Sequence, residues 1–182
     1  LTLAGEPGDV ITLHADTDLT GIAGLVVPEG VTLNLTAAQF QQLDGNGQIT
    51  GIDEDGNATT NYTVNITDLY QADVDNDLNG DGDSDDLGES FILTGVTADY
   101  TTIALAESVE LQVDDDFNGF DVFMGDGLTL TFADITQADG LNISGANATV
   151  VFTDTYAGPF ESIDASGFDV DTLEILNVLV AD

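Results

Sequence analysis

The stretch Val31-Thr32-Leu33-Asn34-Leu35-Thr36 alternates strictly between apolar and polar side chains. Successive side chains of a β-strand point to opposite faces, so this stretch predicts a strand with one buried face and one solvated face. The same alternation recurs between turns rich in Gly, Asp and Asn. It is found at Val10–Leu13, Tyr62–Ile66, Val109–Val113, Leu128–Phe132, Ala148–Phe152 and Leu173–Val178. The sequence therefore predicts an all-β fold.

Helical patterns are confined to two short segments. Residues Ala37–Leu43 predict a short helix that is entered through Thr36 as N-cap and ended by Asp44-Gly45. A weaker helical pattern covers Ala133–Gln137. We therefore expect repeated β-strand units, as a β-solenoid-like or a β-sandwich array, with at most one or two short helices.

Two parts of the chain resemble each other. The alignment pairs Leu13–Gly21 with Leu111–Gly119, and Glu29–Leu35 with Asp126–Phe132. We therefore predict two degenerate copies of one β unit. Residues 1–90 form the first copy, which carries an acidic insertion, and residues 91–182 form the second, packed with the first as one domain or separate from it.

The composition excludes several classes of protein. The 182 residues include 35 acidic side chains and no Lys or Arg, so the formal charge is −35. Without basic side chains we expect no binding to nucleic acid. Cysteine is absent, which excludes disulfides and thiolate metal sites. No apolar run is long enough to span a bilayer, and the chain starts without an initiator Met, so we expect a mature or excised piece of a secreted protein.

Asp is far more frequent than Glu, at 27 against 8 residues, and gathers in loops rich in Gly and Asn. Two explanations compete. The loops bind cations, for which calcium is the best candidate because it takes six to eight oxygen ligands. Alternatively, the carboxylates form an acidic surface that only solvates the protein. The clustering favours calcium.

The strongest acidic cluster runs from Asp73 to Glu89 and contains eight acids in 17 residues. Its spacing fits the start of an EF-hand loop, in which oxygens at alternate positions surround the ion and Gly80 permits the sharp turn. No amphipathic helices flank the loop. The predicted ligands are Asp75, Asp77, Asn79, the carbonyl of Asp81, Asp83 and Asp86.

Two weaker clusters share the beginning of this motif. The first predicts ligands at Asp114, Asp116, Asn118 and Asp121, and its repeat counterpart predicts Asp16 and Asp18. A further acidic turn, Asp53–Asn57, is either a cation loop or the tip of a β-hairpin.

Few residue patterns in the sequence indicate catalysis. A Ser-His-Asp arrangement would have to use His14, and there is no Gly-x-Ser-x-Gly elbow. Trp is absent and there are only four Tyr, so few aromatic side chains are suited to stack against a sugar substrate of a glycosidase. We expect His14 to be a plain surface residue and the protein not to be an enzyme.

The segment Asp75–Asp86 resembles the calcium repeats of thrombospondin type 3. The segments Leu128–Phe132, Ala138–Gly145, Ala148–Phe152 and Leu173–Val178 look like the rungs of calcium-dependent bacterial S-layer proteins and giant surface adhesins. The Gly-Gly-x-Gly-x-Asp nonapeptide of RTX proteins is absent. The resemblance implies a secreted structural protein of the cell surface that binds several Ca²⁺ ions.

Three functional hypotheses follow. The first is a calcium-stabilised S-layer protein, adhesin segment or filament subunit that self-associates, with Leu173–Ala181 as a strand donated to a neighbouring copy. The second is a calcium-dependent module that binds a surface glycan through Tyr70, Tyr100 or Tyr156. The third, an enzyme domain, is the least favoured.

Overall fold

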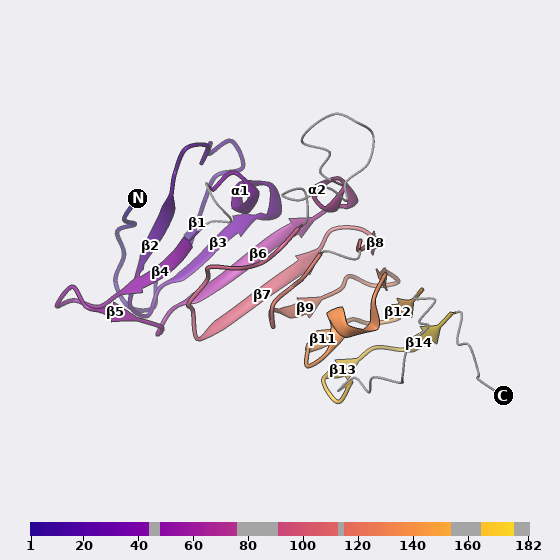
Figure 1. Cartoon of the computed structure of the whole chain (residues 1–182). Coiled ribbons are helices and arrows are strands. Elements are labelled where there is room, and N and C mark those ends of the chain that lie inside the picture. The colour runs from indigo at the N-terminus through magenta and orange to yellow at the C-terminus, as the bar shows by residue number, and fades with distance from the viewer. Residues whose placement is uncertain (44–47, 76–90, 113–114, 154–164, 177–182) are drawn as a thin grey trace. The chain divides into compact units, whose positions relative to one another are not determined.

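The computed structural model describes residues 1–43, 48–75, 91–112, 115–153 and 165–176. They confirm an all-β fold with only two short α-helices. The strands stack in parallel in a β-solenoid-like arrangement of about six turns (Figure 1). Of the two arrays that the alternation allowed, the solenoid-like one is therefore observed. The chain divides into two compact units, each of which draws on two stretches of sequence.

The first unit comprises Leu1–Leu69 and Leu93–Ala104. Its main sheet contains β1, β3, β6 and β7 in that order. A second sheet contains β2, β4 and β5, in which β4 and β5 form an antiparallel hairpin. The elements are β1 (Val10–Thr12), β2 (Gly24–Pro28), β3 (Thr32–Thr36), α1 (Ala37–Gln41), β4 (Gln48–Ile52), β5 (Ala58–Thr59), β6 (Thr63–Leu69) and β7 (Tyr100–Leu105), whose last residue belongs to the second unit.

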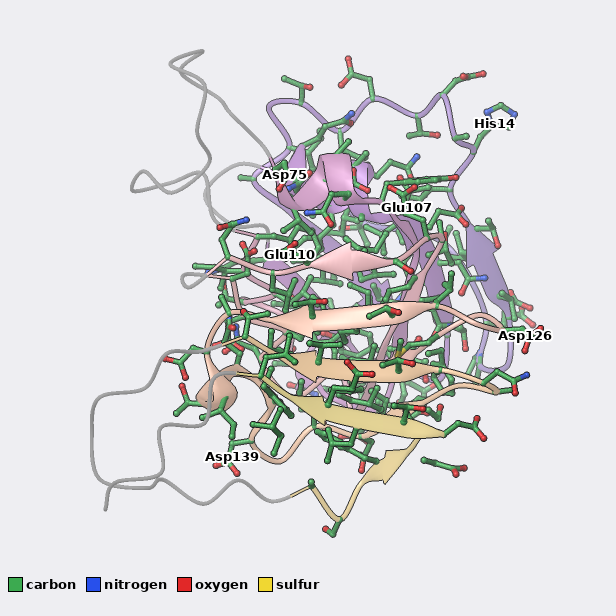
Figure 2. The ribbon with its side chains drawn as sticks, turned by 90° about the vertical axis from the view of Figure 1, so that its right-hand side faces the viewer. His14, Asp75, Glu107, Glu110, Asp126 and Asp139 are labelled. Carbon is green, nitrogen blue, oxygen red and sulfur yellow. The ribbon has the colours of Figure 1, made fainter. Side chains whose placement is uncertain are left out.

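The second unit comprises Tyr70–Ile92 and Leu105–Asp182. One face is a four-stranded parallel sheet in the order β14-β12-β10-β8, which Figure 2 shows as a stack of arrows. The other face carries β9, β11 and β13 in parallel. The elements are α2 (Gln71–Val74), β8 (Val109–Glu110), β9 (Asp121–Phe123), β10 (Thr129–Phe132), the 3-10 helix η1 (Ile135–Ala138), β11 (Ile143–Ser144), β12 (Thr149–Phe152), β13 (Phe168–Asp169) and β14 (Thr172–Ile175).

The core consists of columns of apolar side chains that point inward from successive rungs. In the first unit Leu33 lies in register with Val64, and both are fully buried. In the second unit Phe132 lies in register with Phe152, and their rings stack with centroids 5.5 Å apart. The predicted alternation is confirmed in β3, in β10 and in β6 as far as Thr67, which bury every second side chain.

The outward face of the first unit's main sheet carries a ladder of polar side chains. Asn34 Nδ2 donates to Thr12 Oγ1 at 3.0 Å, and Asn65 Nδ2 donates to Asn34 Oδ1 at 2.8 Å. Thr102 Oγ1 then donates to Asn65 Oδ1 at 2.8 Å. In-register parallel strands place identical positions about 4.8 Å apart, which is why short amides and hydroxyls link rung to rung.

Both predicted helical segments are helical. α1 begins at Ala37 with Thr36 as its N-cap, as predicted, but it ends at Gln41. The weaker pattern at Ala133–Gln137 contains the 3-10 helix η1, which begins two residues later, at Ile135, and ends one residue later, at Ala138. The acidic turn Asp53–Asn57 is the tip of the β4–β5 hairpin, where the Asp53 carboxylate accepts the backbone N–H groups of Asp55 and Asn57.

Candidate functional site

The turns that contain Asp18 and Asp116 share one hydrogen-bond pattern in the two units, although the residue before the glycine has a positive φ at Asn118 and not at Thr20. Asp18 Oδ1 accepts the backbone N–H of Thr20 at 2.9 Å, and Asp116 Oδ1 accepts that of Asn118 at 2.7 Å. The residue between them is buried in each case, as Leu19 or Phe117. The following glycine has φ of 78° at Gly21 and 79° at Gly119, a conformation that favours glycine. Each motif therefore builds a tight corner of the solenoid.

The pKa values of two turn carboxylates reflect these bonds. Hydrogen bonds from the side chain and then the backbone of Thr20 lower the pKa of Asp18 below its usual range. Hydrogen bonds from the backbone and side chain of Asn57 do the same for the pKa of Asp53. In both turns, donors within the chain stabilise the ionised carboxylate.

A glutamine holds the corner in each unit. Gln39 is 2% exposed, and its Nε2 donates to the carbonyls of His14 and Thr17 at 2.7 and 3.4 Å. Its Oε1 accepts the backbone N–H of Thr36 at 3.0 Å, which completes a capping box. Sequence analysis missed this role, although Thr36-x-x-Gln39 is a capping-box pattern that signals it.

Gln137 repeats this arrangement in the second unit. Its Nε2 donates to the carbonyls of Gln112 and Asp115 at 2.6 and 2.7 Å. Its Oε1 accepts the backbone N–H of Asp134, the N-cap of η1, at 2.8 Å. Gln112 and Asp115 align with His14 and Thr17, so the internal repeat extends to individual hydrogen bonds.

Asp115 is a buried carboxylate inside the second predicted cluster. It is 1% exposed, and it accepts the backbone N–H groups of Phe91 and Gln112, both at 2.7 Å. Next to it, Ile92 forms a parallel bridge with Asp116. These contacts attach the segment that begins at Phe91 to the corner. The spacing of the cluster predicted ligands at Asp114 and Asp116, on either side of Asp115, and gave no signal for this anchor.

Gln71 ties α2 to the edge of β8. Its Nε2 donates to the carbonyl of Glu110 at 2.9 Å, and its Oε1 accepts the backbone N–H of Glu110 at 2.6 Å. Its own backbone N–H donates to Glu107 Oε1, and its Nε2 also donates to Asp75 Oδ1 at 3.0 Å. Figure 2 shows Asp75, Glu107 and Glu110 around this contact.

Asp73 lies half-buried beside the same contact. Desolvation by burial is the largest cause that raises the pKa of Asp73, and the nearby carboxylate of Glu107 raises it further. The backbone N–H of Tyr70, which donates to Asp73 Oδ2 at 2.9 Å, opposes both effects. Ionised Asp73 therefore destabilises the folded protein relative to its neutral form.

We expect Asp73→Asn to raise the melting temperature at neutral pH by the equivalent of a few tenths of a kcal/mol, the size of an exposed like-charge pair. The folded pKa lies above the unfolded value of 3.8, so the wild type loses stability as pH rises through that window. The difference in melting temperature between Asp73→Asn and the wild type should therefore vanish below about pH 3.8 and grow above it. Thermal unfolding against pH measures this, with exposed Asp55→Asn as control. An equal effect of both variants at every pH would contradict the prediction.

Amides take the place of basic side chains beside other carboxylates. Asn142 Nδ2 donates to Asp121 Oδ1 at 2.7 Å, and Asn147 Nδ2 donates to Asp126 Oδ1 at 2.6 Å. Each pair links neighbouring rungs. In a chain without Lys or Arg, side-chain amides thus donate hydrogen bonds to carboxylates, although they do not neutralise the negative charge.

Half of the twelve predicted calcium ligands lie in the described residues. Asp18, Asp116 and Asp121 accept hydrogen bonds from the chain. Asp16 is exposed, 3.5 Å from the exposed ring of His14. Asn118 sits in the corner with φ of 46°, and Asp75 ends α2. The other predicted ligands lie outside the described residues: Asp77, Asn79, Asp81, Asp83, Asp86 and Asp114.

Within the described ranges, no three His, Cys, Asp or Glu residues converge in a way that could hold a metal ion. The six predicted ligands in those ranges are therefore not brought together as one site. The calcium assignment stays a prediction that depends on Asp77–Asp86.

Comparison with known proteins adds no relative. No protein-family model, curated protein or solved structure matches the chain. The helices in the described residues are also too short or too polar to cross a membrane.

Proposed function

We propose that the chain is a secreted structural protein of the cell surface, stabilised by calcium, that serves as an S-layer component, an adhesin segment or the subunit of an extracellular filament. The observation that carries this proposal is the stack of parallel rungs in which the same corner is built twice. Each rung of such a stack is stabilised mainly by its neighbours, which suits extended structural proteins.

The charge distribution supports the calcium part of the proposal. The chain carries a formal charge of −35, and the amides that contact its carboxylates cannot neutralise it. The segment with most of the ligands predicted in the strongest cluster follows Asp75, whose carboxylate accepts a hydrogen bond from Gln71 Nε2. It precedes Phe91, whose backbone N–H donates to the carboxylate of Asp115. Both ends are held by the fold, which lowers the entropy cost of closing the loop around an ion.

We expect calcium to raise the melting temperature and a chelator to lower it, while magnesium has a much smaller effect. Each ion present at 100 times its dissociation constant should add about 2.7 kcal/mol to the free energy of unfolding. Differential scanning calorimetry across calcium concentrations measures this. Asp83→Asn with Asp86→Asn should remove most of the response, and Asp55→Asn should leave it intact. A melting temperature that ignores calcium would show that the acidic residues only form a solvated surface.

A further inference from the structure

The four-stranded sheet of the second unit is closed at one edge. The side-chain amide of Gln71 donates to the carbonyl and accepts the N–H of Glu110, so it occupies the outer edge of β8 as a neighbouring strand would. Unpaired strand edges invite association, and folded proteins commonly block them. In this sheet, the side-chain amide of Gln71 blocks the edge of β8.

The opposite edge of that sheet is open. Thr172 and Leu176 donate their N–H groups to the carbonyls of Ala148 and Phe152, at 3.1 and 2.8 Å. By the alternation of a strand, the N–H groups of Leu173 and Ile175 point away from β12. Among the described residues, no strand pairs with β14 on that side.

The apolar column is exposed at this edge. In β12, Val150 and Phe152 are 0% and 1% exposed, but their partners in β14, Leu173 and Ile175, are 48% and 52% exposed. The rung that would cover them is missing from the described part of the chain.

The first unit has an open edge at β1. Thr32 donates to the carbonyl of Asp9, and Leu13 donates to that of Asn34 at 3.0 Å, so the N–H groups of Val10 and Thr12 point away from β3. β3 is the only described strand that pairs with β1. By the repeat, β1 corresponds to β8, because Thr12 and Glu110 each lie two residues before the first carbonyl bound by the corner glutamine. Gln71 blocks the edge in β8, and no described side chain bonds to the outward backbone groups of β1.

Exposed apolar side chains gather at these two edges. Of the eight large hydrophobic residues that are exposed in the described chain, one lies on β1 and three lie on β14 or directly after it. They are Val10, Leu173, Ile175 and Leu176. One molecule therefore presents two different unpaired edges with apolar side chains.

We infer that β14 of one copy pairs in parallel with β1 of a second copy, so that copies join head to tail. This inference rests on the proposed structural function and specifies the strands through which two copies associate. Setting Leu173 opposite Ile11 places Ile175 opposite Leu13, which aligns the two inward apolar columns. The same register sets Glu174 opposite Thr12, so no two carboxylates face each other within the paired strands. Directly before them Asp171 lies opposite Asp9, a like-charge pair that opposes the contact and that salt screens.

A contact between two different edges of one chain is heterologous and leaves a free edge at each end. Such a contact builds an open filament where the rotation between copies does not close, and a ring where it does. The −35 charge on each copy opposes association, and salt that shortens the Debye length to about 3 Å at 1 M should favour it.

Proline tests the contact and leaves the backbone pairs inside each copy in place. Thr12→Pro and Ile175→Pro each remove one outward N–H group, and an edge strand tolerates proline where its N–H faces solvent. Thr12→Val and Ile175→Val keep the N–H and serve as matched controls. Thr12→Pro also removes the hydroxyl that accepts from Asn34, and Thr12→Val removes it equally, so the control matches this loss. All four are compared with the wild-type chain by sedimentation velocity over a range of concentrations in about 1 M NaCl.

We expect the wild type and both valine variants to form species that grow with concentration, and each proline variant to associate about tenfold more weakly or not at all. An equimolar mixture of the two proline variants should form a one-to-one dimer that does not grow, because each supplies the edge that the other lacks. A wild type that stays monomeric, or proline variants that each assemble like the wild type, would overturn the inference. The calcium response is measured by unfolding and does not depend on this contact, so its failure would leave the pairing result unaffected.

Discussion

Replacing Gln39 with leucine is expected to lower the free energy of unfolding by about 3 kcal/mol. The side chain is 2% exposed and satisfies the carbonyls of His14 and Thr17 and the N–H of Thr36. Leucine has a similar volume, so it fills the space but leaves the Thr17 carbonyl and the Thr36 N–H without this partner, while the His14 carbonyl keeps the N–H of Thr17. Each unsatisfied buried group costs about 1–3 kcal/mol. Urea unfolding followed by circular dichroism measures the loss.

The matched control is Gln48→Leu, because Gln48 is exposed on β4. Its effect should stay within about 0.5 kcal/mol, as for most surface substitutions. Gln137→Leu should reproduce the larger loss in the second unit, since its amide makes the equivalent bonds. A loss for Gln39→Leu no greater than that of the control would mean that the corner does not depend on the amide.

Asp115→Ala is expected to destabilise the second unit by about 2–4 kcal/mol. Its buried carboxylate accepts the N–H groups of Phe91 and Gln112, and alanine leaves both donors without that acceptor. Hydrogen exchange should show faster exchange at these two amides before global unfolding. Asp16→Ala is the control, because its carboxylate is 92% exposed.

Asp115→Ala also distinguishes whether the Asp115 carboxylate anchors the backbone or binds a metal ion. The partners of Asp115 in the structure include backbone N–H groups, so the loss should be the same in calcium and in chelator. A loss that appears only in calcium would instead make Asp115 part of a cation site. The comparison therefore tests how the whole acidic run Asp114–Asp116 should be interpreted.

The alternation located half of the fourteen strands in the described residues. All seven alternating segments lie on strands of the structure, namely β1, β3, β6, β8, β10, β12 and β14. It missed the other seven strands, which include β7 in the first unit's main sheet. β9, β11 and β13 are two or three residues long, too short for a period of two to be visible, and β2 is the largely apolar run Gly24–Pro28.

The acidic motifs show where sequence reasoning reaches its limit. Spacing of the Asp-x-Asp-x-Asn-Gly type marks both a cation loop and a tight corner, because each needs an oxygen acceptor followed by a glycine at positive φ. At Asp18 and Asp116 the structure shows the corner. At Asp77–Asp86 the calcium prediction stands untested.

The sequence by itself determined the β-class, the inward columns such as Leu33 and Val64, the two helical segments and the internal repeat, because these follow from local periodicity and self-similarity. Only the tertiary structure decided that the strands pair in parallel, that Gln39 and Gln137 close the corners and that β1 and β14 are left at open edges. An alternating strand looks the same whichever neighbour it takes. Parallel partners lie some 20 to 30 residues away, as Thr149 does from Thr129 and Thr63 from Thr32, so pairing is decided by long-range packing.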